Sequence, residues 1–142
     1  MRILDSAATQ TGLYVTIFSG GQMPRAEIKS KGGFKSGDNW YIPGQKRAVA
    51  TGSVRHDNGY AADVWLYTDP DRKNILTPGV NVGPPAKAEQ FIKACKALGA
   101  TSIGVGPGYM GGTGIHIDIT GQFPYWAKKG AAAPGWLVKI MA

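Results

Sequence analysis

Both histidines of the chain lie in short stretches that also carry an aspartate. His56 in VRHDNGYAADVWLY stands seven residues before Asp63, and His116 in TGIHIDIT stands two residues before Asp118. Two imidazoles and one carboxylate, with a fourth position left open to water, can form a catalytic zinc site. His56, Asp63 and His116 are therefore candidate ligands of one Zn²⁺ ion. Such an ion lowers the pKa of its bound water and polarises a carbonyl group.

The spacing of these residues is also compatible with structures that hold no metal ion. Side chains two residues apart on a strand share a face, so Asp118 could hold the His116 imidazole or exchange a proton beside it. The same pattern is typical of a half-exposed strand that turns its polar residues outward. His56 and Asp63 could simply flank the DNG turn that leads into a buried strand. The opposite face of the His116 strand is expected in the core and consists of Ile115, Ile117 and Ile119.

The segments around the two motifs predict an α+β fold with a small, mostly antiparallel sheet flanked by helices. In the predicted strand 61–67, Asp63 occupies one face, and the other face, which suits a core, carries Ala62, Val64 and Leu66. Further strands are predicted at 13–21, 101–106 and 114–120, with a short strand around 39–43. The rest of 24–47 is polar and glycine-rich, which predicts a long loop.

Two helices are predicted beside this sheet. The first spans 3–10 and ends at Gly12, a residue suited to the left-handed turn of a helix C-terminus. The second spans 84–100 and presents an apolar stripe made of Phe91, Ile92, Cys95 and Leu98. The apolar tail is expected to end in a strand or a short helix.

Composition predicts one globular domain, residues 1–142, with 43% hydrophobic and 18% charged residues. The single cysteine excludes an intramolecular disulfide and a zinc site of several cysteines. The net charge of +7 favours a polyanion as partner, whether nucleic acid, anionic membrane or cell wall. Its basic residues are scattered without a basic helix or a known binding motif, which disfavours specific nucleic-acid recognition. No apolar run reaches the roughly 20 residues of a membrane span, so membrane insertion is not expected.

Residues 56–63 read H-x-x-G-x-A-x-D and resemble the first metal motif of the zinc D-Ala-D-Ala peptidases. This group also takes in lysostaphin-type enzymes and the hedgehog signalling domain. YVTIFSGGQ (14–22) resembles the early strand of the family, which ends in a Ser-Gly-x-Arg turn. GVGPGYMGGTGIHIDI (104–119) resembles the late glycine-rich segment and ligand strand of the branch in which the last histidine is followed by x-Asp. The resemblance extends loosely over 3–126.

This resemblance implies a hedgehog/D-Ala-D-Ala-peptidase-like fold and Zn²⁺ held by His56, Asp63 and His116. It also implies a metallopeptidase that cleaves peptide bonds in bacterial peptidoglycan, as a D,D- or L,D-carboxypeptidase or endopeptidase. With no secretory signal at its start, the chain is expected to be made in the cytoplasm and to act at the wall as a phage lysis enzyme or virion component. Expected partners are the peptidoglycan peptide and other virion proteins.

The chain departs from the family at the residues that assist the metal. Many members place an acid three residues before the last ligand or a histidine two before it, where this chain has Thr113 and Gly114. Asp118 is the nearest acid, and it could be the general base or only a partner of His116. The turn arginine that often binds substrate is Gln22 here, and Arg55 could supply that positive charge instead.

Two other classes of function remain compatible with the sequence. One is a zinc-stabilised, non-catalytic module of the same fold that binds the cell wall or belongs to a virion, because the expected acid or histidine before His116 is missing. The other is a basic, nucleic-acid-associated protein whose histidines have no metal role.

Overall fold

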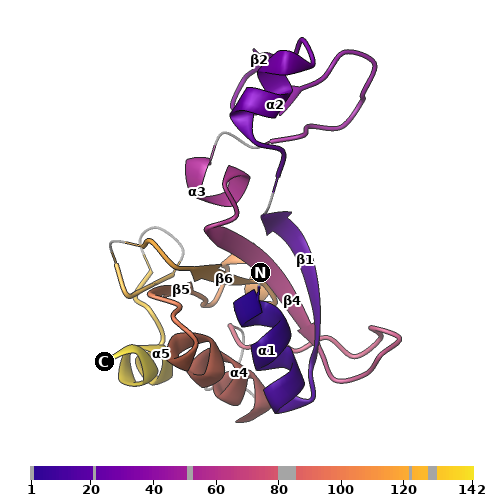
Figure 1. Ribbon diagram of the computed structural model, residues 1–142. Coiled ribbons are helices and arrows are strands. Elements are labelled where there is room, and N and C mark those ends of the chain that lie inside the picture. The colour runs from indigo at the N-terminus through magenta and orange to yellow at the C-terminus, as the bar shows by residue number, and fades with distance from the viewer. Residues whose placement is uncertain (1, 21, 51–52, 80–85, 122, 128–130) are drawn as a thin grey trace.

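The computed structural model describes residues 2–20, 22–50, 53–79, 86–121, 123–127 and 131–142, and it shows an α+β fold (Figure 1). The helices are α1 (Arg2–Thr11), α2 (Arg25–Ser30), α3 (Val54–Asp57), α4 (Ala86–Ala97) and α5 (Gly135–Met141), with a 3₁₀ turn, η1, at Met110–Gly112. The strands are β1 (Tyr14–Gly20), β2 (Phe34–Ser36), β3 (Asn39–Tyr41), β4 (Ala61–Tyr67), β5 (Ser102–Gly104), β6 (Ile115–Asp118) and β7 (Tyr125–Trp126). None of the described helices is long and apolar enough to cross a membrane.

The main sheet has the order β1-β4-β6-β5-β7 and is mostly antiparallel, as predicted. Only the short pairing of β7 with β5 is parallel. The strand pairing sets Asp63 opposite His116, and His116 opposite Gly104 on its other side. Since neighbours across a sheet share a face, two residues 53 positions apart in the sequence are brought side by side.

One face of this sheet is covered by α1, α4 and α5 (Figure 1). The apolar face of β4 packs there as predicted, with Ala62, Val64 and Leu66 all buried. Phe91, at the centre of α4, is fully buried against them. The metal-ligand candidates therefore lie on the opposite face, and the core behind the sheet keeps their strands in place.

Two residues predicted for the core are exposed. Leu98 has 37% of its surface exposed because α4 ends at Ala97 and the chain turns away at Gly99. Ile119 is 41% exposed because β6 ends one residue earlier, at Asp118. The start of the predicted helix, 84–85, lies outside the described residues, and the apolar tail forms the short helix α5.

Residues 22–50 project from the body as a small lobe rather than as the long loop predicted for 24–47 (Figure 1). Only its short strand near 39–43 was predicted, and it forms the hairpin β2–β3. Pro24 immediately precedes α2, and the carbonyl of the fully buried Ile28 accepts a hydrogen bond from the amide of Gly33, just before the hairpin. A six-residue helix with one buried apolar side chain has too little periodicity to be recognised in sequence.

Gly12 ends α1 with a left-handed backbone, φ 65°, as its sequence position predicts. The turn is a Schellman motif, because the amide of Gly12 bonds to the carbonyl of Thr9 and that of Leu13 to Ala8. We expect Gly12→Ala to lower the free energy of unfolding by about 1–2 kcal/mol, because an alanine Cβ strains this conformation. Urea denaturation measures this loss.

Gly135→Ala is the matched control, because a Cβ at Gly135 meets no atom within 4 Å and the backbone there is not left-handed. An equal loss of stability in both variants would contradict the assignment of the Gly12 effect to backbone strain.

Candidate metal centre

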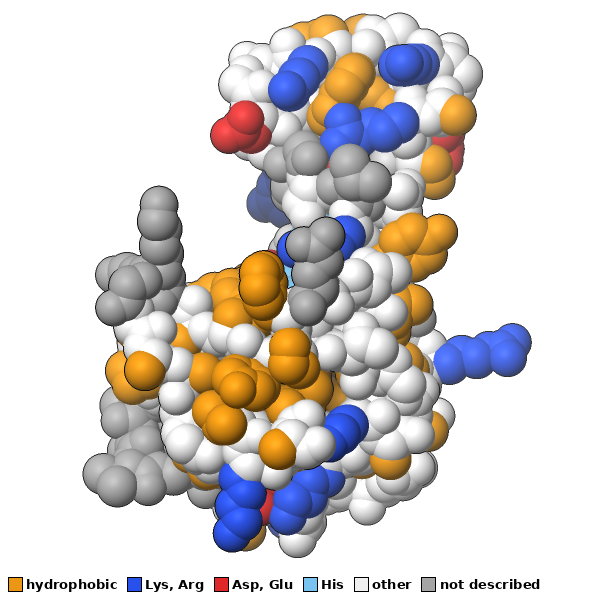
Figure 2. Space-filling view, turned by 90° about the vertical axis from the view of Figure 1, so that its left-hand side faces the viewer, with side chains coloured by type: hydrophobic (Ala, Val, Ile, Leu, Met, Phe, Trp, Pro, Cys, Tyr) orange, Lys and Arg blue, Asp and Glu red, His pale blue; other side chains and the backbone are white. Residues whose placement is uncertain are grey.

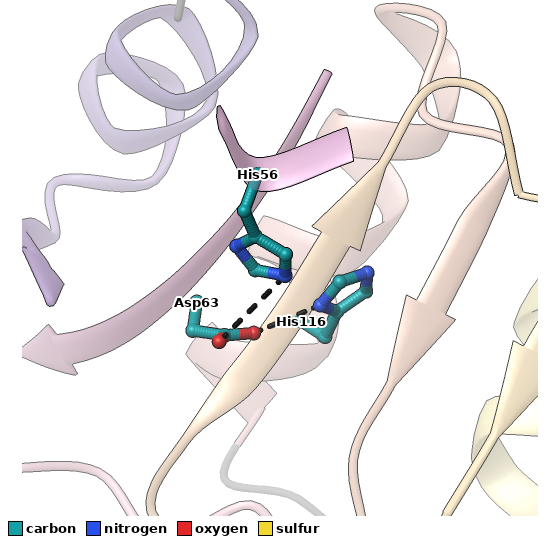
Figure 3. Close-up of side chains that lie close together, drawn as sticks. All are labelled: His56, Asp63 and His116. Carbon is teal, nitrogen blue, oxygen red and sulfur yellow. Dashed lines mark hydrogen bonds and ion pairs between the residues drawn. The ribbon is translucent and has the colours of Figure 1, made fainter. Parts of the chain in front are cut away.

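His56, Asp63 and His116 meet on the face of the sheet opposite the helices, at the foot of the lobe (Figure 3). They come from α3, β4 and β6, and each offers one ligand atom within 4.8 Å of the others. Asp63 Oδ1 lies 2.8 Å from His116 Nδ1, and Asp63 Oδ2 lies 3.8 Å from His56 Nε2. The residues predicted as a ligand set are thus brought together as a group that could hold a metal ion.

The donor set and two of its three spacings are compatible with a tetrahedral metal ion. Ligand atoms about 2 Å from a tetrahedral zinc lie about 3.3 Å from one another, and the two distances to Asp63 bracket that value. Both histidines are buried, which separates this group from the acidic clusters common on protein surfaces. Burial lowers the pKa of His56 despite the opposing charge of Asp63, and this favours the neutral imidazole that a metal requires.

The free nitrogen of each imidazole faces a polar partner. Ser19 Oγ lies 3.2 Å from His56 Nδ1, which leaves Nε2 facing Asp63. On His116, Nε2 lies 3.5 Å from Asp118 Oδ2, and Nδ1 is the atom that faces Asp63. Partners of this kind fix the ring orientation of metal-binding histidines. Sequence reasoning missed Ser19, although the FSG ending of its strand belongs to the segment that resembles the family.

Asp118 is fully buried and held on both oxygens. Oδ1 accepts hydrogen bonds from the amide and hydroxyl of Thr120, at 2.6 and 3.0 Å, and Oδ2 pairs with Arg55 at 2.7 Å. Burial raises the pKa of Asp118, but the Thr120 bonds and the Arg55 charge outweigh it, so the pKa is lowered. A buried carboxylate with a lowered pKa is a poor proton acceptor and a good fixed charge. All of β6 is buried, so the half-exposed strand considered from the sequence is wrong.

An open pocket of about 550 Å³ begins beside this group. Its lining residues are Arg55, Ser102, Thr120, Phe123 and Trp126. The Trp126 ring contacts the His116 ring with centroids 4.9 Å apart. Gly104 makes this possible, because a Cβ there would stand 2.6 Å from the indole. The three candidate ligands are not among the described residues that line the pocket, and its lining residue Trp126 contacts one of them, His116.

Tyr109 and Tyr125 were considered with Trp126 as possible cleft residues. Tyr109 packs edge-on against Trp126, with centroids 4.8 Å apart. Burial raises the pKa of Tyr109, and the charge of Asp63 adds to this, so its hydroxyl stays protonated. Tyr125 packs against the core instead. Of the three aromatic residues, Trp126 lines the pocket.

The lobe is tied to the candidate metal group by Arg25, whose guanidinium pairs with the buried Asp57 next to His56. The same guanidinium lies 4.8 Å over the ring of Trp40 in the lobe. Sequence reasoning missed this connection, because it joins residues 32 positions apart and no local pattern marks it.

The chain was compared with protein-family models, with curated proteins and with solved structures. None of the three comparisons found a match.

Proposed function

We propose that this chain is a zinc metallopeptidase that cleaves peptide bonds in bacterial peptidoglycan, with a fold like that of the zinc D-Ala-D-Ala peptidases and hedgehog domains. The observation that carries the proposal is the meeting of His56, Asp63 and His116 within 4.8 Å. These are the three positions that the resemblance assigns to zinc. The His-x-Asp sequence at residues 116–118 resembles the third-ligand pattern of one branch of that family.

The three side chains would hold zinc through His56 Nε2, an oxygen of Asp63 and His116 Nδ1. A zinc ion in such a site supplies a water of lowered pKa and polarises a carbonyl group. Two neighbouring side chains would hold the ligand histidines in position. Ser19 orients His56, and Asp118 faces the far nitrogen of His116. Asp118 is therefore assigned a positioning role, and its low pKa argues against a role as general base.

Arg55 is the residue proposed to meet the substrate. One of its nitrogens pairs with Asp118, which fixes the guanidinium beside the pocket, and 49% of its side chain is still exposed. A positive charge there suits the carboxylates of wall peptides and the oxyanion that forms when a peptide bond is attacked. In this role Arg55 replaces the family arginine that is Gln22 here.

The proposed place of action is the bacterial wall, reached as a phage lysis enzyme or a virion component. The net charge of +7 would favour adsorption to an anionic wall. The proposed partners are the peptidoglycan peptide and, in a virion, other virion proteins.

A second candidate is a zinc-stabilised module of the same fold without catalysis. It is favoured by the state of Asp118, which is fully buried, accepts hydrogen bonds from Thr120 on Oδ1 and is ion-paired with Arg55 on Oδ2. In this alternative, zinc would join α3 to the sheet and stabilise the fold, and the pocket would bind wall peptide without cleaving it.

Digestion of purified peptidoglycan separates the two candidates. Zinc-loaded protein is incubated with peptidoglycan, and new amino groups are measured with and without a chelator. The peptidase should release amino groups in a zinc-dependent manner. Binding to the wall without any release in zinc-replete buffer would favour the module.

A further inference from the structure

We propose that the lobe, residues 22–50, is a binding surface for the glycan strands of the wall, whose attached peptides carry carboxylates. The inference rests on the proposed function, because that function places such a polymer beside the metal group.

The lobe exposes aromatic side chains that it cannot bury. Its fully buried apolar residues are Ile28 and Ala50, which make only a minimal core. Phe34 is 51% exposed and stacks on Tyr41 across the β2–β3 hairpin, with centroids 5.8 Å apart and an interplanar angle of 22°. The two rings form an apolar platform at the surface, where Phe34 is the more exposed of the two. The apolar faces of sugar rings stack on platforms of this kind.

Positive charge surrounds this platform. The lobe is about one fifth of the chain, yet its six basic and two acidic side chains supply +4 of the net +7. In the described part of the chain, four of these basic side chains have no carboxylate within ion-pair distance: Lys29, Lys35, Lys46 and Arg47. Figure 2 shows the same arrangement, with blue side chains around an orange patch on the upper part of the molecule. Such a surface attracts a polymer that carries carboxylates.

The lobe stands next to the candidate metal group. In Figure 2 a pale-blue histidine is visible at its foot, and both histidines of the chain belong to that group. The pairing of Arg25 with Asp57 ties the lobe to the residue that follows His56. A glycan held on the lobe would therefore bring its attached peptide close to the candidate metal group.

The details favour a glycan over a nucleic acid. Glu27 and Asp38 interrupt the basic surface, whereas a nucleic-acid site follows the phosphate backbone with continuous positive charge.

The test measures binding to intact peptidoglycan sacculi, stripped of other wall polymers, by cosedimentation on ice. Two lobe variants are compared with wild type: Phe34→Ala with Tyr41→Ala, and Lys29→Gln with Lys35→Gln and Lys46→Gln. Each should weaken binding about tenfold, since one removes the stacking surface and the other the charge. Two matched controls change exposed residues of the body. One is Tyr14→Ala with Phe18→Ala, and the other is Lys87→Gln with Lys96→Gln and Lys139→Gln.

The proposal would be overturned if the lobe variants bound sacculi as tightly as wild type. It would also be overturned if the control variants lost as much sacculus binding as the lobe variants. Tighter binding of the wild-type protein to single-stranded RNA than to soluble glycan fragments would overturn it as well. Hydrolysis of a short wall peptide by the wild-type protein separates this proposal from the proposed function. Hydrolysis without sacculus binding overturns the glycan surface alone. Lobe-dependent binding without hydrolysis supports the surface and contradicts the peptidase.

Discussion

Replacing His116 with alanine should remove zinc from the protein and abolish hydrolysis of wall peptide. His116 Nδ1 is 2.8 Å from Asp63, so its loss leaves His56 and Asp63, two donors that cannot complete a three-ligand site. The loss of activity should exceed the roughly 10- to 100-fold effect of changing a residue that only supports a ligand. Zinc per chain, measured by mass spectrometry of metals, should fall from about one to near zero.

His116→Asp is the informative companion variant, because an aspartate keeps an oxygen donor on the same strand. It should retain more zinc than His116→Ala does. Circular dichroism shows whether each variant keeps its fold, since His116 is buried. A folded His116→Ala protein that still holds one zinc and still cleaves wall peptide would contradict the assigned site.

Replacing Asp118 with asparagine should weaken zinc binding by about 10- to 100-fold, because a residue that orients a ligand acts through metal affinity. The asparagine keeps the size of the side chain but loses the charge that pairs with Arg55 and faces His116 Nε2. At saturating zinc the rate should largely recover. Zinc titration with a competing chelator measures the affinity, and hydrolysis at several zinc concentrations measures the recovery.

Thr120→Val is the matched control for this prediction. It removes the hydroxyl bond to Asp118 Oδ1 but keeps the charge and the shorter backbone bond. Its effect on zinc affinity should be smaller than that of Asp118→Asn. An Asp118→Asn protein with unchanged zinc affinity and a rate that zinc cannot restore would identify Asp118 as the general base.

The three residues of the candidate metal group could be named from the sequence chiefly because of the resemblance of residues 56–63 and 104–119 to the family motifs. His56 and Asp63 belong to one eight-residue pattern, and alternation along a strand predicts the face of His116. The structure then brings them together through the pairing of Asp63 with His116. The main strands and helices were predicted for the same reason, because each carries a repeated apolar pattern.

The contacts that orient the site could not be predicted in this way. The ion pair of Arg25 with Asp57 and the contact of Ser19 with His56 join segments 32 and 37 residues apart, and only the folded chain defines them. The position of the Trp126 ring depends on the absence of a side chain at Gly104. This dependence arises only from the pairing of β7 with β5, which sets the two residues side by side.

The lobe was missed because its elements are short. Its helix and two strands span six, three and three residues, too few for a hydrophobic period to stand out. The prediction for Ile119 failed at the end of a strand. The alternation of apolar residues continues to Ile119 in the sequence, but β6 ends at Asp118 and Ile119 is exposed.

The measurement that tests the central claim most directly is mass analysis of peptidoglycan after incubation with zinc-loaded protein. The account predicts pairs of fragments that differ from the uncut peptide by one water and that share one cleaved peptide bond, absent from the His116→Ala digest. Peptidoglycan that stays intact in zinc-replete buffer, or fragments that arise only from cleavage between sugars, would contradict it.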